Sequence, residues 1–233
     1  MISIVIPTYN EAAHIASLVT YLRAHANGEV SEIIVSDAGS DDNTLSLAQA
    51  AGAMAVTSPR KGRSAQMNYG VSLSSGEILY FLHADCKPPP TFVADIKNAV
   101  AEGYELGRYF TRYNSGKTIL KINAFFTRFD FFICMGGDQT LFVTRTVFER
   151  SNGFKEDMKI MEEYEFCERV RKLARYKIIN RAVLISARKY ETNSWLRVQL
   201  ANASVVRMYR KGASQQEMLD TYKRMLNYRK NAF

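Results

Sequence analysis

The chain has 233 residues, a formal net charge of +8 and 47% hydrophobic residues. This composition excludes a disordered or collagen-like chain, and the length suits one sizeable domain with at most a small appendage. The three cysteines, Cys86, Cys134 and Cys167, are too scattered to imply a disulfide framework or a zinc cluster. No uninterrupted apolar run reaches the roughly 18–20 residues that span a bilayer, and the N-terminus lacks a signal-peptide pattern. We therefore expect a reduced protein in the cytoplasm.

The charge is unevenly distributed along the chain. Residues 1–100 contain six basic and nine acidic residues, whereas residues 101–233 contain 25 basic and 14 acidic residues. The excess of positive charge in the second half has two equally good explanations, an anionic partner or a basic surface exposed to solvent. Such a partner would be a nucleic acid, an anionic membrane surface or a phosphorylated substrate.

The first hundred residues alternate between apolar strands and helices. The predicted strands cover residues 2–7, 33–36, 53–57 and 78–82. Helices are predicted between them, and we expect the side chain of Asn10 to cap the first one. Strand–helix units of this kind indicate a parallel sheet with helices on both faces, and the strands lack polar alternation, as expected for burial on both sides. The predicted fold class is α/β.

Polar residues follow each predicted strand. In a parallel sheet these carboxyl ends meet at one rim, where ligands bind. A nucleotide at that rim would meet an acidic group for its base or sugar, basic groups for its phosphates and a carboxylate for a divalent metal. The residues expected there are Thr8, Tyr9, Asn10, Glu11, Asp37, Arg60, Lys61, Arg63, His83, Ala84 and Asp85.

Loop aspartates have a second common role, which is to cap helices, and we prefer that role for Asp41 and Asp42. Asp85 differs because it follows a fully apolar strand and precedes three prolines that stiffen its loop. The chain contains neither a GxxxxGK[ST] loop nor a GxGxxG fingerprint, so the nucleotide would be held by another arrangement.

The second half contains an aromatic segment and a basic C-terminal segment. Residues 104–134 interleave Tyr and Phe with Lys and Arg, a pattern that fits a core, an acceptor site, a membrane-facing lip or a site for single-stranded nucleic acid. Residues 194–233 predict two helices separated at residues 211–212, each with an apolar and a basic side. Such helices pack against the domain, pair two subunits as a homodimer or lie on an anionic membrane.

The motifs together resemble a family 2 glycosyltransferase of the nucleotide-sugar-dependent GT-A type. The matching segments are ISIVIPTYNE, IIVSDAGSDDNT, KGRSAQMNYG, LYFLHADCKPP, GGDQTLFVTRTVFERSNGF and MKIMEEYEFCERVRKL. Each segment alone is weak, but their order and spacing over about residues 2–190 make the match strong, and the FLHAD and GDQTLF forms resemble a bacterial subgroup. The resemblance implies a Rossmann-like, mostly parallel sheet flanked by helices over residues 1–190. Residues 1–100 would be the nucleotide-binding half, residues 101–190 the acceptor half and residues 191–233 a helical extension.

The resemblance implies a site for a nucleoside-diphosphate sugar. The segment that lines the nucleoside pocket matches Pro7, Thr8, Tyr9 and Glu11, and the acidic position near the base matches Asp37, beside which Ala38 replaces a second acid. The segment that approaches the diphosphate matches Arg63 and Gln66.

The metal motif matches His83, Ala84 and Asp85, with His83 in place of the usual first acid. Asp85 is the expected ligand of Mg²⁺ or Mn²⁺. His83 would be a second ligand, a sugar contact, a neutral helper or a packed side chain.

The resemblance places the catalytic carboxylates in the acceptor half. Glu163 matches the base that takes the acceptor proton in an inverting transfer, with Glu162 as the alternative, and Asp138 matches a loop that borders the sugar and the acceptor. From the local pattern alone, Glu162 and Glu163 are favoured as acidic residues that stabilise the N-terminus of a helix. For Asp138 the alternative is a structural role in a turn. Arg188, after a strand predicted at residues 183–187, is a weaker candidate for a diphosphate contact.

We therefore expect a metal-dependent, inverting hexosyltransferase (EC 2.4) with an unknown acceptor and no nucleic-acid partner. A lipid-linked acceptor would suit a protein at the inner face of the membrane. One alternative is a catalytically degenerate binding protein, because Ala38, His83 and Glu163 depart from the family pattern. A nucleotidyltransferase is the weaker alternative, because PTYNE stands where its Gly-rich basic loop would be.

Overall fold

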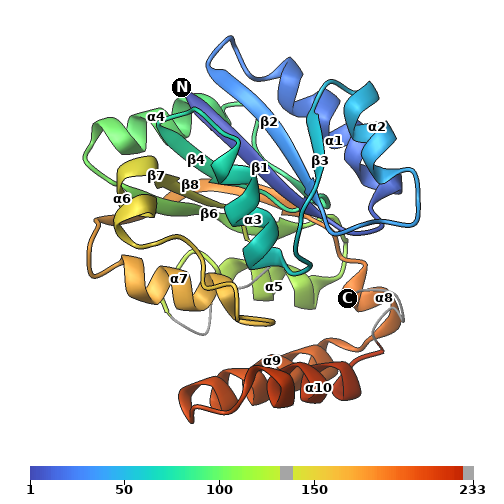
Figure 1. The fold of residues 1–233 in the computed structure, drawn as a ribbon. Coiled ribbons are helices and arrows are strands. Elements are labelled where there is room, and N and C mark those ends of the chain that lie inside the picture. Colours follow the sequence, from blue (N-terminus) through green and yellow to red (C-terminus); the bar gives the residue numbers. More distant parts are fainter. Residues whose placement is uncertain (132–138, 228–233) are drawn as a thin grey trace.

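The structure, a computed structural model, describes residues 1–131 and 139–227. Its centre is one eight-stranded sheet with the strand order β3-β2-β1-β4-β7-β6-β8-β5 (Figure 1). The strands are β1 (Ile2–Thr8), β2 (Val30–Asp37), β3 (Met54–Thr57), β4 (Ile78–Phe81), β5 (Cys86–Lys87), β6 (Leu106–Tyr113), β7 (Leu141–Thr144) and β8 (Tyr176–Ile185).

The sheet is mixed rather than uniformly parallel. Strands β3, β2, β1 and β4 pair in parallel, as do β6 and β8. Strand β7 lies antiparallel between β4 and β6, and the short β5 pairs antiparallel with β8. The predicted α/β class is confirmed, and the parallel half is the one built by the first four strand–helix units.

Helices cover both faces of the sheet. One buried apolar cluster joins the sheet to α1 (Ala12–Ala24), α2 (Thr44–Ala50) and α4 (Phe92–Ala101), and a second joins it to α3 (Arg63–Ser72), α6 (Arg145–Arg150) and α7 (Glu162–Val170). Helix α3 approaches β1 closely, because a Cβ on Gly70 would lie 2.4 Å from a methyl group of Val5. This contact fixes the helix whose first turn carries Arg63.

The C-terminal segment forms a hairpin of α9 (Trp195–Arg210) and α10 (Gln215–Met225), preceded by the short α8 (Lys189–Thr192). The hairpin lies beside the sheet domain and packs on α5 (Thr118–Phe126) and on the segment before α7 (Figure 1). Ser194 and Ser214 cap the two helices through their side chains. The predicted pair of helices with a break at residues 211–212 is therefore confirmed.

Two local expectations differ from the structure. Asn10 does not cap α1: its backbone is left-handed, with φ of 54°, and its Oδ1 accepts a hydrogen bond from Asp41 N at 2.9 Å. The strand predicted at residues 183–187 is the end of the longer β8, which begins at Tyr176. Asp42, as expected, binds helix-start amides, those of Thr44 at 3.0 Å and Ala12 at 3.2 Å.

Candidate functional site

The carboxyl ends of β1, β2 and β4 lie beside one another, because these strands are parallel neighbours in register. Thr8 pairs with Asp37 across β1 and β2, and the loop with His83 and Asp85 follows β4. Arg188 reaches the same rim from the end of β8, since it forms an ion pair with Asp85. The structure thus brings most of the predicted donor-site residues together.

Asp37 is fully buried and shapes the loop after β2. Its Oδ1 accepts hydrogen bonds from Thr8 Oγ1 at 2.8 Å and Ser40 Oγ at 2.6 Å, and its Oδ2 accepts from the backbone amides of Gly39 at 2.9 Å and Ser40 at 2.6 Å. Four donors occupy both carboxylate oxygens. Asp37 therefore holds the loop after β2 in place, with Ala38 buried next to it.

Gln66 holds two strand ends together instead of projecting into the open rim. Its side-chain amide donates to the carbonyl oxygens of Thr8 and Ser36, both at 2.7 Å, and only 1% of the residue is exposed. Tyr9, on the neighbouring loop, is partly exposed and has the Lys61 ammonium 5.8 Å from the centre of its ring. Pro7 is buried within β1.

Arg188 bridges two acidic residues of the rim. Its Nη1 and Nη2 bind the two carboxylate oxygens of Glu11 at 2.9 and 2.7 Å, and its Nε lies 3.0 Å from Asp85 Oδ2. The planar guanidinium suits this bidentate geometry. Sequence reasoning gave Arg188 only a weak role, because Glu11 and Asp85 lie far from it in the sequence.

The described residues contain no cluster of three or more His, Cys, Asp or Glu side chains able to cage a metal ion. Asp85 nevertheless suits a different mode, in which one or two carboxylates and the phosphates of a nucleotide share a hard cation. Its Oδ1 accepts a hydrogen bond from the weak donor Cys86 Sγ, at 3.8 Å, and part of its side chain is open to solvent. The residues present therefore fit a Mg²⁺ or Mn²⁺ ion that arrives with a diphosphate.

Glu162 and Glu163 begin α7 directly after Met161, whose backbone is left-handed with φ of 68°. Both carboxylates are buried, and each pairs with a basic side chain from another part of the chain. Glu162 Oε1 lies 2.7 Å from Arg63 Nε, and Glu163 Oε1 lies 3.0 Å from His83 Nε2. Helix α7 is thereby joined to the start of α3 and to the loop after β4.

The two members of the His83–Glu163 pair have raised pKa values. Burial raises the pKa of Glu163, and the nearby His83 offsets this only in part. Burial alone would lower the pKa of His83, but the charge of Glu163 and the hydrogen bond to it outweigh burial, and the pKa of His83 rises. The pair therefore holds a proton more tightly than either side chain does in water.

A small cavity of about 20 Å³ lies beside Glu163, with Arg108, Thr140 and Cys167 among its lining residues. Its size is that of a single water molecule. Glu163 Oε2 and Arg108 Nε are among the buried polar atoms that have no hydrogen-bond partner within the described part of the chain. Sequence reasoning missed Arg108, although a lone arginine in the otherwise buried start of β6 is a detectable signal.

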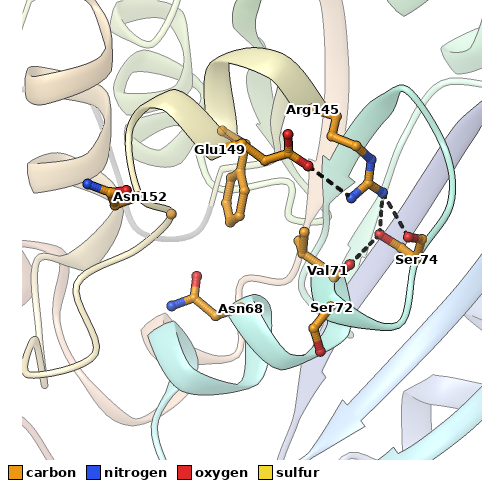
Figure 2. Close-up of a pocket in the computed structure, with 9 residues that line it drawn as sticks. Asn68, Val71, Ser72, Ser74, Arg145, Glu149 and Asn152 are labelled. Atoms are coloured by element: carbon orange, nitrogen blue, oxygen red, sulfur yellow. Dashed lines mark hydrogen bonds and ion pairs between the residues drawn. The ribbon is translucent and has the colours of Figure 1, made fainter.

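A larger pocket of about 410 Å³ lies elsewhere, between α3 and α6. Figure 2 shows that Arg145, at one edge of the pocket, points toward Ser74 and Glu149, and that Asn68 lies on the opposite side. The guanidinium of Arg145 binds the Gly76 and Ser74 carbonyl oxygens, and Asn68 binds the backbone of Phe154. The polar groups of this pocket are used in holding loops, and none of the predicted site residues lines it.

One predicted site residue cannot be placed. Asp138 lies outside the described residues, and so does Cys134. Within the described residues, no helix is both long enough and apolar enough to cross a membrane.

A mannosyltransferase and a glucosyl-3-phosphoglycerate synthase are among the solved structures with a similar fold. A mannosyltransferase from Pyrobaculum calidifontis, in complex with GDP-Man and Mn²⁺, superposes with a TM-score of 0.68 over 96% of this chain and 69% of that one, at 16% identity. The glucosyl-3-phosphoglycerate synthase from Mycobacterium tuberculosis, in complex with Mg²⁺ and UDP, gives a TM-score of 0.61 over 91% of this chain and 80% of that one, at 22% identity. The fold is that of the GT-A glycosyltransferases.

The family model for glycosyl transferase family 2 matches residues 3–179, and the chain belongs to this family. Glucosyl-3-phosphoglycerate synthase of Mycobacterium tuberculosis is 33% identical over 122 residues, which are 48% of this chain and 38% of that protein. Undecaprenyl-phosphate 4-deoxy-4-formamido-L-arabinose transferase of Pseudomonas paraeruginosa is 32% identical over 115 residues, 46% of this chain and 34% of that protein. The matched segments cover little more than a third of either relative.

Proposed function

We propose that this protein transfers a hexose from a nucleoside-diphosphate sugar to an acceptor hydroxyl, with inversion at the sugar and with a divalent metal. The observation that carries this proposal is the state of Glu163. His83 holds one of its oxygens, while the other is buried, unpartnered among the described residues and next to a small cavity. A carboxylate prepared in this way is suited to accept a proton from a hydroxyl group.

The donor occupies the rim in this proposal. Pro7, Thr8, Tyr9, Ala84 and the loop held by Asp37 surround the nucleoside. Asp85 would hold Mg²⁺ or Mn²⁺ together with the diphosphate, and the bound ion would supply positive charge for the leaving group. Arg188 exchanges its contacts with Glu11 and Asp85 for the diphosphate when the donor binds, because phosphate is an equally good bidentate partner for a guanidinium.

The acceptor approaches Glu163 from the side of the second half of the chain. Glu163 Oε2 takes the proton as the hydroxyl oxygen attacks the anomeric carbon opposite the diphosphate. Glu162 holds Arg63 near the donor. It is the second choice for the base, because its Oε1 is already paired with Arg63 Nε. Asp138 stays a candidate for a sugar contact.

The comparisons support a metal and a nucleotide donor by analogy. The solved relatives contain Mn²⁺ with GDP-Man and Mg²⁺ with UDP, and the FLHAD and GDQTLF forms mark a bacterial subgroup in our interpretation. One curated relative is named for an undecaprenyl-phosphate substrate. We extend this to a lipid-linked acceptor at the cytoplasmic face of the membrane.

A screen of nucleoside-diphosphate sugars tests the donor part. With the cognate donor and Mn²⁺, the thermal midpoint of the wild type should rise, and Asp85→Ala should lose most of this rise. Glu77→Ala is the matched control, because the Glu77 side chain is 91% exposed at the opposite end of β4. An equal response of the wild type and Asp85→Ala to every donor would show that the metal assignment is wrong. The absence of any metal-dependent donor binding would favour a degenerate binding protein.

A further inference from the structure

An exposed aromatic ridge runs along α5 and the turn that follows it. Its side chains are large and apolar, and each is between 38% and 61% exposed. They are Ile119, Ile122, Phe125, Phe126, Phe129 and Phe131. Six of the twelve exposed large hydrophobic residues in the described chain therefore lie within thirteen consecutive positions. An apolar patch of this kind marks an interaction surface.

The four phenylalanines of the ridge form one cluster, because their rings contact one another. The ring centres of Phe125 and Phe129 lie 5.6 Å apart, those of Phe125 and Phe126 5.9 Å apart, and those of Phe129 and Phe131 6.1 Å apart. Helix α5 buries only Leu120 and Ala124 against the rest of the protein. The remaining apolar side chains of the helix are thus not needed for its own packing.

The charge around the ridge is mostly positive. Residues 106–131 contain five basic residues and one acidic residue, Asp130, which forms an ion pair with Arg171. The guanidinium of Arg128 lies 4.1 Å from the ring centre of Phe110 and 5.7 Å from that of Phe125, and Lys121 is exposed on the same helix. Phenylalanines framed by cations match the interface of an anionic bilayer, where rings enter the acyl boundary and cations meet the head groups. A second copy of this chain, with a net charge of +8, matches the ridge less well.

The ridge is attached to the Glu163 cavity through one side chain. Arg108 Nη1 donates to the carbonyl oxygen of Thr127 at 2.7 Å, at the end of the ridge helix, and Arg108 also lines the cavity beside Glu163. A membrane that contacts the ridge would therefore lie close to the carboxylate to which we assign the acceptor.

We propose that the aromatic ridge inserts into the interface of an anionic lipid bilayer and thereby presents the Glu163 cavity to an acceptor carried by that bilayer. The docking surface is argued from exposure and charge alone, whereas the acceptor class rests on the proposed function.

Vesicle co-sedimentation of the full chain tests the docking surface. The wild type should bind vesicles of mixed phosphatidylcholine and phosphatidylglycerol more strongly than vesicles of phosphatidylcholine alone. The double variant Phe125→Ser/Phe126→Ser should bind the mixed vesicles at least about tenfold more weakly, because two rings that insert into the interface are lost. Leu73→Ser is the matched control, since Leu73 is a single exposed apolar residue at the end of α3, and it should bind like the wild type.

Three measurements keep the result interpretable. An unchanged thermal midpoint of the double variant shows that it folds, and unchanged hydrolysis of the donor sugar in solution shows that its donor site is intact. Vesicle binding by a wild type that hydrolyses no donor would support the docking surface while the proposed function fails. Equal binding by the wild type and the double variant would overturn the docking surface. A lipid-free wild-type dimer that the double variant converts to a monomer would overturn it as well, because a second copy would then cover the ridge.

Discussion

At the residue scale, the central feature is the buried contact between His83 and Glu163. It joins the loop after β4 to the first turn of α7, which form the donor and acceptor sides in our proposal. The sequence places these residues eighty positions apart, so only the fold could reveal that they form a pair. The pairing also gives His83 a role other than that of a metal ligand.

The raised pKa of Glu163 predicts a pH dependence. Glu163 must be ionised to act as a base, so the rate of transfer should fall on acidification with a midpoint above the ordinary value of 4.5. His83 lowers the pKa of Glu163, whereas burial raises it. In the variant His83→Gln, the pKa of Glu163 is no longer lowered by a nearby imidazole. The acid limb of the pH–rate profile should therefore move to higher pH. The rate of transfer against pH measures this, with His14→Gln as a control outside the site. A limb that stays in place, or moves down, would contradict the pairing.

The contacts of Arg188 predict an effect on metal binding. The guanidinium competes with a cation for Asp85 and Glu11, so Arg188→Gln should bind Mn²⁺ more tightly than the wild type when no donor is present. The same variant should bind the donor diphosphate more weakly, because it lacks a phosphate contact. Calorimetric titrations with Mn²⁺ alone and with donor plus Mn²⁺ separate the two effects. Weaker Mn²⁺ binding without donor would argue against competition at Asp85.

At the element scale, the C-terminal hairpin supports the segment that leads into α7. Met158, Ile160 and Met161 share a buried cluster with Val205 of α9 and Met218 of α10. Gln215 Oε1 accepts hydrogen bonds from the backbone amides of Lys159 at 3.0 Å and Ile160 at 3.2 Å. The left-handed residue Met161 follows directly, so the hairpin helps to hold the backbone from which Glu163 projects.

This support predicts that Gln215→Ala slows transfer without weakening donor binding. The loss of two hydrogen bonds frees the backbone before Met161, and a displaced base costs rate rather than affinity. A severalfold fall in kcat with an unchanged dissociation constant for the donor is expected. Gln216→Ala is the matched control, since Gln216 contacts only the exposed side chains of Lys159 and Asp220 among the described residues. Equal effects of the two variants would indicate that the hairpin has no specific link to the site.

Elements with local signals were predictable, and contacts across the sheet were not. Apolar runs gave β1 and β4, and the breaks at Gly28 and Gly52 follow α1 and α2, because both signals depend on neighbouring residues only. The mixed half of the sheet was less predictable, since β7 enters antiparallel between two distant strands. The same limit applies to the site: Asp85 follows its strand in sequence, but its ion pair with Arg188 and the bonding of Gln66 to two strand ends depend on tertiary packing.

At the scale of the whole molecule, the uneven charge matches the division of labour that we propose. The acidic first half carries the rim with Asp37 and Asp85, where carboxylates shape a loop or suit a metal. The basic second half carries the aromatic ridge and the hairpin, which lie at the same end of the molecule (Figure 1). In our proposal, the net charge of +8 reflects a surface near the acceptor side more than a site for nucleic acid.

The most direct test of the central claim compares donor binding with donor consumption in Glu163→Gln. With the donor identified by the screen and Mn²⁺ present, the wild type should bind the nucleotide sugar and consume it, by transfer or by slow hydrolysis. Glu163→Gln should bind the donor with a similar dissociation constant and lose nearly all consumption, because the amide cannot accept the proton. Glu162→Gln should keep a larger share of the rate. Consumption by Glu163→Gln at the wild-type rate would contradict the account.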